Sequence, residues 1–126
     1  MQKPTHKDWL FVANEDLLGA KRLASDRAIL SPAFFLTQQG VEKALKGYLL
    51  FKQQPLLSTH DLALLLKECS KFDANFLSFF DHVTQLGGYL TSTRYPDDAW
   101  YVPDEPTLVE AIELAEQVIR FVESLV

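Results

Sequence analysis

Residues 31–52 read SPAFFLTQQGVEKALKGYLLFK, and this stretch decides the fold. Small side chains recur along it every three or four residues, a spacing that places them on one face of an α-helix. Each glycine inside a helix costs roughly 1 kcal/mol relative to alanine, so we expect a second backbone to pack closely there. The alternative is an exposed face on which the pattern is fortuitous. The residues of this small-residue face are Ala33, Thr37, Gly40, Ala44 and Gly47.

Helical periodicity continues on the N-terminal side of this stretch. Apolar residues at helical spacing predict a first helix over residues 9–27. Ser31 and Pro32 are expected to begin the second helix, because serine accepts hydrogen bonds from free N–H groups and proline suits a first helical turn. The second helix is predicted to run from Pro32 to about Lys52.

Three further helices are predicted on the C-terminal side. Ser58 and Asp61 have the spacing of a capping box for a third helix, a fourth is expected from Asp73, and a fifth from a capping box at Thr107. Five helices and no strand predict an all-α fold, an up-and-down helical bundle. The apolar stripe predicted for the last helix comprises Leu108, Ile112, Ala115, Ile119 and Val122.

Residues 91–106 are rich in proline, aspartate and threonine, which predicts a loop. Gly87 and Gly88 are expected to weaken the end of the helix before it. Trp100 and Tyr101 are predicted to pin the loop onto the bundle, because large aromatic side chains are stabilised by burial.

Composition limits the kind of protein. The chain has 126 residues, 48% of them hydrophobic, so we expect one domain over residues 1–126 with a core of its own. A formal charge of -5 argues against a broad basic surface for nucleic acid. Cys69 is the only cysteine, and no stretch resembles a secretory signal or a membrane-spanning helix. These features predict a cytoplasmic protein.

The first candidate site is the sequence Thr59-His60-Asp61-Leu62. It places a histidine and a carboxylate at the start of a helix, where free N–H groups and the helix dipole favour an anion such as phosphate. The alternative is that Asp61 only caps the helix and His60 lies on the surface.

The second candidate site is Arg94-Tyr95, followed by Pro96. The arginine offers a planar fork for phosphate or carboxylate, the tyrosine can stack on a base, and the proline stiffens the segment. The alternative is an ion pair between arginine and aspartate that anchors the loop, with Tyr95 packed beside it.

Polar residues also lie on the apolar sides of the first two helices. Asp16 is expected to need a partner there, with Arg94 as the first choice, unless it lies at the solvated rim. On the second helix, Lys43 or Lys46 is in a position to reach a phosphate. The alternative is that these lysines form a solvated stripe with Gln38, Gln39 and Glu42, held by weak ion pairs four residues apart.

Templates for other chemistry are absent from the sequence. His6, His60 and His82 lack metal-ligand spacing, and there is no phosphate-binding glycine-rich loop and no nucleophile turn. We therefore expect no metal and no cofactor, and we assign no catalytic residue.

Taken together, the motifs resemble the HEPN domain family, whose name abbreviates higher eukaryotes and prokaryotes nucleotide-binding. The resemblance is carried by the second helix over residues 33–46, by THDL at residues 59–62 and by RYPD at residues 94–97. It implies a helical bundle that commonly forms a homodimer and often acts beside a minimal nucleotidyltransferase, sometimes as the toxin in a toxin–antitoxin pair.

By position, the resemblance makes His60, Asp61, Arg94 and Tyr95 the candidate nucleotide site, with Lys43 as a further phosphate ligand. Many family members are metal-independent ribonucleases that use an arginine followed, after four to six residues, by a histidine. No histidine follows any arginine of this chain at that distance, so the resemblance does not extend to the ribonuclease motif.

The preferred interpretation is therefore a nucleotide-binding and partner module rather than a self-sufficient enzyme. The first alternative is a ribonuclease toxin in which folding brings His60 to Arg94. The second is a non-catalytic, dimeric interaction domain, with the small-residue face and the aromatic loop as its interface. The preferred interpretation requires the start of the third helix and the Arg94-Tyr95 segment to form one pocket.

Overall fold

A computed structural model describes residues 2–25, 27–98 and 100–126, leaving the side chains of Leu90, Thr91, Ser92 and Arg94 undescribed. Over these ranges the chain forms five α-helices and one 3₁₀ helix, without a strand, so the all-α prediction is confirmed. The elements are α1 (His6–Ala24), α2 (Leu30–Phe51), α3 (Leu62–Ser70), η1 (Ala74–Phe79), α4 (Phe80–Arg94) and α5 (Glu105–Leu125).

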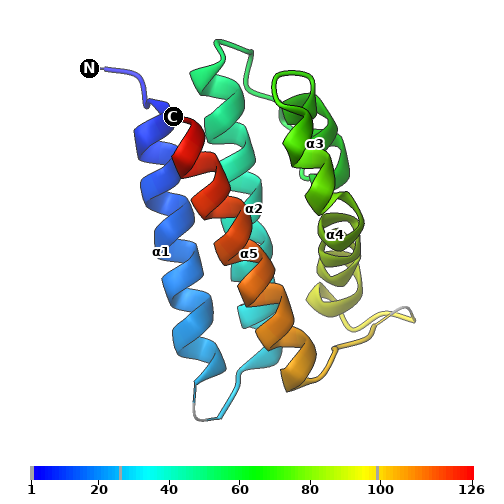
Figure 1. Cartoon of the computed structure of the whole chain (residues 1–126). Helices are drawn as coiled ribbons and strands as arrows, with labels where there is room; N and C mark the ends of the chain where they lie inside the picture. The colour runs from blue at the N-terminus through cyan, green and yellow to red at the C-terminus, as the bar shows by residue number, and fades with distance from the viewer. Residues whose placement is uncertain (1, 26, 99) are drawn as a thin grey trace.

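The long helices α1, α2 and α5 lie side by side, and α3 with α4 forms the remaining side of the bundle (Figure 1). Both chain ends lie at the same end of the molecule. The ring of Tyr89 in α4 lies 5.2 Å from that of Phe34, and Ser31 Oγ donates to the carbonyl of Thr93 at 2.8 Å. These contacts make α4 antiparallel to α2, and they bring the end of α4 to the start of α2.

The small-residue face of α2 packs directly against α1. A Cβ added at Gly40 would lie 3.2 Å from the backbone oxygen of Ala13, and one added at Gly47 would lie 3.1 Å from Cβ of Trp9. The close backbone approach expected from the sequence is therefore confirmed. The interaction-domain alternative placed an interface with another molecule on this face. That part of the alternative is wrong, because α1 covers the face.

The core draws on every helix. At its centre the Phe76 ring lies 4.8 Å from that of Tyr48 and 4.9 Å from that of Phe121, which joins η1 to α2 and α5. Such aromatic contacts add to the free energy gained by burial. The stripe predicted for α5 is buried at Leu108, Ile112, Ala115, Ile119 and Val122.

In the described part of the chain, none of the helices combines the length and the hydropathy that a membrane-spanning helix needs.

Carboxylates, rather than hydroxyl groups, cap two of the helices. Asp61 accepts from the backbone N–H of Leu64 at 3.2 Å, and Asp104 accepts from that of Thr107 at 2.9 Å. The predicted caps at Ser58 and Thr107 were therefore wrong. A charged acceptor at the positive end of the helix dipole explains the preference.

The first two helices also begin earlier than predicted. α1 starts at His6, because the backbone N–H of Thr5 donates to Asp8 at 2.8 Å within a capping box. α2 starts at Leu30 without a side-chain cap, so the predicted role of Ser31 was wrong. Its hydroxyl reaches α4 instead, as described above.

The helix predicted from Asp73 is divided. Asp73 caps the 3₁₀ helix η1, and α4 follows it and continues past Gly87 and Gly88 as far as Arg94. The helix therefore extends beyond residue 90, where the sequence predicted a loop. Contacts of α4 with α2 and α3 stabilise these turns despite the low helix propensity of the two glycines.

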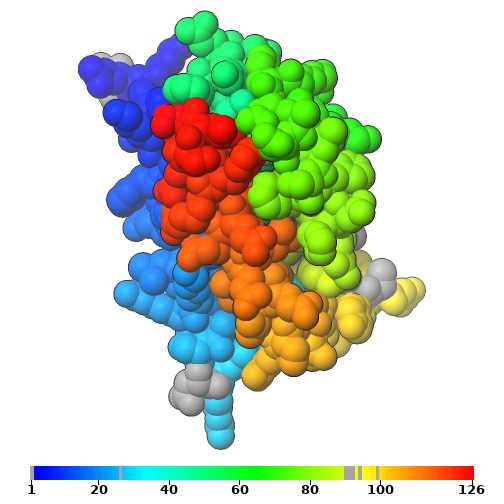
Figure 2. Space-filling model, viewed as in Figure 1, coloured from blue at the N-terminus to red at the C-terminus, as the bar shows by residue number. Residues whose placement is uncertain are grey.

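The loop of residues 95–104 leaves its aromatic side chains in solvent. Trp100 is 54% exposed and Tyr101 is 61% exposed, so the prediction that they pin the loop was wrong. Among the described residues of the loop, Pro103 is buried. The segment after α4 projects from the side of the bundle, whereas α5 covers the middle of the same face (Figure 2).

Candidate functional site

A pocket of about 410 Å³ lies between α2, α3 and α4. Its volume falls in the range of small-molecule sites, about 300–1,000 Å³. It combines the start of α3, which the sequence singled out, with parts of α2 and α4 that are distant in sequence. Its lining residues are Gln38, His60, Asp61, Leu62, Ala63, Thr84, Gly87 and Gly88.

Two glycines of α4, Gly87 and Gly88, line this pocket. A Cβ added at Gly88 would meet nothing within 4 Å, and one added at Gly87 would lie 3.9 Å from Cβ of Leu62. The space beside Gly88 is therefore open.

A buried polar group lies behind the pocket wall. Glu42 is 4% exposed and accepts from Lys46 Nζ at 3.2 Å, and Lys46 is only 6% exposed. The same carboxylate lies 3.0 Å from Nδ1 of His60. The solvated stripe considered from the sequence is therefore wrong for Glu42 and Lys46. Their burial is compatible with folding because each charge is paired.

The contact with Glu42 fixes the orientation of His60. An ionised carboxylate only accepts hydrogen bonds, so this contact is a hydrogen bond in the tautomer whose Nδ1 carries the proton. The side chain of His60 is 71% exposed, and Nε2 is the ring nitrogen that Glu42 does not engage. His60 is thus held from behind while presenting its ring toward solvent and the pocket.

Gln38 contributes an unsatisfied acceptor. It is 1% exposed, and no donor within the described part of the chain reaches its Oε1 atom. Leaving a buried acceptor unpaired costs about 1–3 kcal/mol. Gln38 also lines the pocket.

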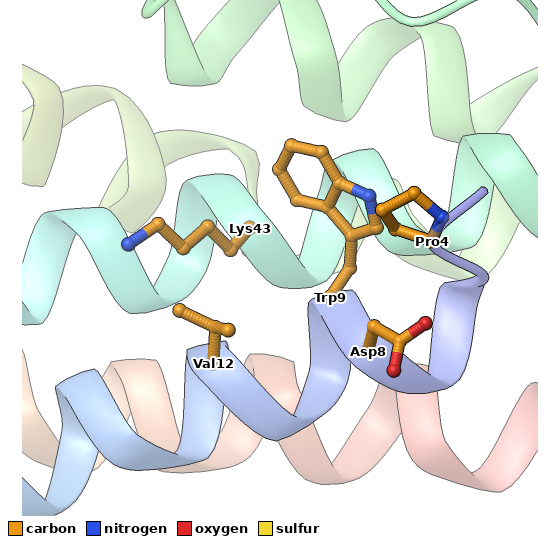
Figure 3. Close-up of a pocket in the computed structure, with 5 residues that line it drawn as sticks. All are labelled: Pro4, Asp8, Trp9, Val12 and Lys43. Carbon is orange, nitrogen blue, oxygen red and sulfur yellow. The ribbon is translucent and has the colours of Figure 1, made fainter. Parts of the chain in front are cut away.

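Asp16 and Lys43 form a separate ion pair on the other side of α2. Lys43 Nζ donates to Asp16 Oδ2 at 2.7 Å, with side chains 24% and 14% exposed. Asp16 is therefore paired with a lysine of α2, which lies against α1, and the side chain of the predicted first choice, Arg94, lies outside the described residues. Lys43 also lines a groove of about 330 Å³ with Trp9 and Val12, where it extends along α2 (Figure 3).

The other predicted site residues lie at the end of α4. Arg94 is its last residue, six positions after Gly88 and so about 9 Å further along the helix axis, and its side chain lies outside the described residues. Tyr95 is 63% exposed and is not among the residues that line the pocket. The pocket thus brings His60 and Asp61 together, but does not include Tyr95.

Sequence reasoning missed Gln38, Glu42 and Thr84 as residues of this region. A signal existed for the first two, because Gln38, Glu42 and Lys46 recur every four residues and must share a helix face. No comparable signal marked Thr84 or the role of Gly88, since the pocket forms only when α4 packs beside α3.

Other reactive groups are buried or scattered. Cys69 donates through Sγ to the carbonyl of Leu45 at 3.5 Å, and burial raises the pKa of its thiol to about 12. A thiol with this pKa stays protonated and is a poor nucleophile. Within the described ranges, no three histidine, cysteine or acidic side chains are placed to hold a metal ion.

The packing of the five helices and the polar pocket at the start of α3 define a small helical-bundle module. The sequence pattern of the HEPN domain matches residues 6–125. This chain belongs to the HEPN domain family, which confirms the resemblance noted in the sequence.

Two solved structures are similar over nearly their whole length. TT1696 from Thermus thermophilus is 28% identical with a TM-score of 0.84, covering 96% of this chain and 98% of that one. ST0689, an archaeal HEPN homologue, is 24% identical with a TM-score of 0.75, covering 98% of both chains. No curated protein sequence matches.

Proposed function

We propose that this HEPN domain binds a nucleotide, or a partner that carries one, in the pocket between α2, α3 and α4. The observation that supports this most is the convergence of Gln38, His60 and Asp61 in one cavity of about 410 Å³. A pocket with a few polar groups and an apolar wall is typical of small-ligand sites.

In this proposal each polar residue has a separate role. His60 and Asp61 orient the ligand, and Arg94, which ends the helix that supplies Gly88, binds the phosphate at the mouth of the pocket. Tyr95 offers a stacking surface beside Arg94. Lys43 has no role in the proposal, because it is paired with Asp16 in a different groove.

Isothermal titration calorimetry with ATP, GTP and a short RNA at modest salt tests the proposal. We expect at least one of them to bind, and Gly88→Leu to abolish binding by filling the pocket. Arg94→Gln should weaken binding, whereas the matched Lys43→Gln should not. Absence of heat and of a thermal shift with every ligand would refute nucleotide binding.

We further propose that the protein acts as a homodimer together with a minimal nucleotidyltransferase, as in a toxin–antitoxin system. Family membership supports this part, and the exposed Trp100 and Tyr101 provide apolar surface for a partner. Co-expression with the neighbouring reading frames, followed by co-purification and mass measurement, tests it. The proposal would be contradicted if the protein purified as a monomer without any protein encoded by the neighbouring reading frames. A nucleotidyl adduct on Tyr95 would support it.

A second candidate function is metal-independent RNA cleavage. The contact between Glu42 and His60 Nδ1 favours it. A carboxylate that binds Nδ1 orients the ring, so that Nε2 can act as the general base that removes the proton of the 2′-hydroxyl. Expression should then arrest growth, and His60→Ala should relieve the arrest. His82→Ala, which changes another exposed histidine, is the matched control. Growth arrest that survives His60→Ala would exclude this mechanism.

A non-catalytic interaction domain is the outcome if neither nucleotides nor RNA bind. Of the two surfaces considered from the sequence, only the aromatic loop of residues 95–104 is accessible, because α1 covers the small-residue face.

A further inference from the structure

We infer that Glu42, held by Lys46, is a positioning residue that keeps the proton of neutral His60 on Nδ1. The other ring nitrogen, Nε2, then accepts a hydrogen bond from a hydroxyl or amino group of the ligand, and the phosphate binds to a different residue. The tautomer of His60 is a property of the unliganded protein, whereas the choice of ligand group rests on the proposed function and extends it.

The carboxylate of Glu42 bridges a buried cation and an accessible imidazole. Its Oε2 atom accepts from Lys46 Nζ at 3.2 Å, and its Oε1 atom lies 3.0 Å from Nδ1 of His60. The side chains of Glu42 and Lys46 are 5% and 8% exposed, so water competes little for this carboxylate. Because Lys46 engages one oxygen, the other is held in place to meet His60.

The charge of Glu42 determines which ring nitrogen carries the proton. Glu42 and Lys46 form a buried ion pair, and a buried ammonium group without an ionised partner would be unfavourable. An ionised carboxylate has no proton to donate, so its hydrogen bond with His60 requires the proton on Nδ1. A protonated Glu42 that donated to Nδ1 would give the opposite tautomer, so the two states can be distinguished by experiment.

The acceptor at Nε2 is accessible to a ligand. His60 lines the pocket of about 410 Å³, its side chain is 71% exposed, and no group in the described part of the chain hydrogen-bonds to Nε2. The next residue, Asp61, caps α3 and so fixes the backbone that carries the imidazole. A hydroxyl or amino group can donate to Nε2, whereas the oxygens of an ionised phosphate are acceptors themselves. His60 therefore contacts a donor of the ligand.

Nitrogen-15 NMR of the labelled, unliganded protein tests the tautomer. Correlations from the ring protons distinguish a protonated from an unprotonated nitrogen in each histidine. At the high-pH plateau of the titration, we expect a ratio of about 10 to 1 or more in favour of the proton on Nδ1 of His60. His82, an exposed histidine that hydrogen-bonds to nothing in the described ranges, should show a mixture of tautomers in the same spectrum. A proton mainly on Nε2 of His60 would overturn the inference.

Two variants assign the tautomer to Glu42. Glu42→Leu with Lys46→Met removes the carboxylate without leaving a buried charge, so the tautomer ratio of His60 should approach that of His82. Asp61→Asn removes the carboxylate next to His60 in the sequence and keeps a side chain that can cap α3, so it should leave the ratio unchanged. An unchanged ratio in the double variant would exclude the positioning role of Glu42.

The same resonances identify the ligand group. When AMP or GMP, whichever binds, saturates the protein at this pH, Nε2 should stay unprotonated and its resonance should shift upfield, as for a nitrogen that accepts a hydrogen bond. A resonance that does not move, or a proton gained by Nε2, would overturn the contact with a donor. Failure of every nucleotide to bind would refute the proposed function and the ligand group together, whereas the spectrum of the unliganded protein would still decide the tautomer.

Discussion

Two glycine-to-alanine substitutions should have opposite effects on stability, although both glycines lie inside helices. At Gly88 the added methyl group meets nothing within 4 Å. The substitution therefore keeps the full gain in helix propensity, about 1 kcal/mol. At Gly40 the same methyl group would lie 3.2 Å from the backbone oxygen of Ala13 and 3.5 Å from Cδ1 of Ile119.

The contact at Gly40 should outweigh the gain in helix propensity. The oxygen of Ala13 belongs to the backbone of α1, so it can move away only if the helix moves with it. Overpacking of this kind costs about 1–3 kcal/mol, which leaves a net loss of about 1 kcal/mol for Gly40→Ala. An unfolding entropy of about 2.1 cal/mol/K per residue over 126 residues converts 1 kcal/mol into about 4 °C.

Thermal unfolding followed by far-ultraviolet circular dichroism measures both variants. Gly88→Ala should raise Tm by about 4 °C and Gly40→Ala should lower it by about 4 °C. Gly88→Ala also serves as the control for Gly40→Ala, because both variants add one methyl group and restrict the backbone of the unfolded chain to the same extent. A Tm that rises equally in both variants would refute the close packing of α1 on the small-residue face.

Other substitutions test the ion pairs and the thiol. Asp16→Ala leaves Lys43 half-buried and unpaired, so the free energy of unfolding measured in urea should fall by about 1–2 kcal/mol. Adding Lys43→Met should recover part of this loss. An unchanged urea midpoint for Asp16→Ala would contradict the ion pair. Glu42→Leu leaves the buried charge of Lys46 without a partner and should lower the free energy of unfolding by about 3 kcal/mol. The double variant Glu42→Leu with Lys46→Met removes both charges and should change it little. Equal losses in the single and the double variant would contradict the burial of this ion pair. The Cys69 thiol should resist modification at pH 8 until the protein unfolds, and labelling of the native protein at the unfolded rate would contradict its burial. Because its pKa rises from 9.0 to about 12 on folding, the unfolded thiol ionises first, and the free energy of unfolding should fall as pH rises between these values.

The sequence came closest to the structure where local spacing carries the information. Small residues at helical intervals predicted a close backbone contact on this face of α2, which the distances at Gly40 and Gly47 confirm and assign to α1. Helix ends were less predictable, since Ser58 and Asp61 both offer acceptors and only the folded backbone determines which one meets a free N–H group.

For the candidate site, the sequence identified one part and misplaced others. His60 and Asp61 do line a pocket, but Lys43 lies in another groove, and Tyr95 is not among the pocket residues. The pairing of Asp16 with Lys43 was not predicted, because the relative rotation of α1 and α2, which brings the two charged groups within 2.7 Å, follows from packing of whole helix faces.

By itself, the sequence determined the helical class, the buried stripe of α5 and membership of the HEPN domain family, because helical periodicity and short motifs are local properties of the chain. Only the tertiary structure decided that His60 reaches Glu42, that Gln38 Oε1 is buried with no donor in the described part of the chain, and that Gly88 lines a pocket. Each of these depends on the distance between helices that are remote in sequence. That distance is set by the packing of the whole bundle rather than by any one segment.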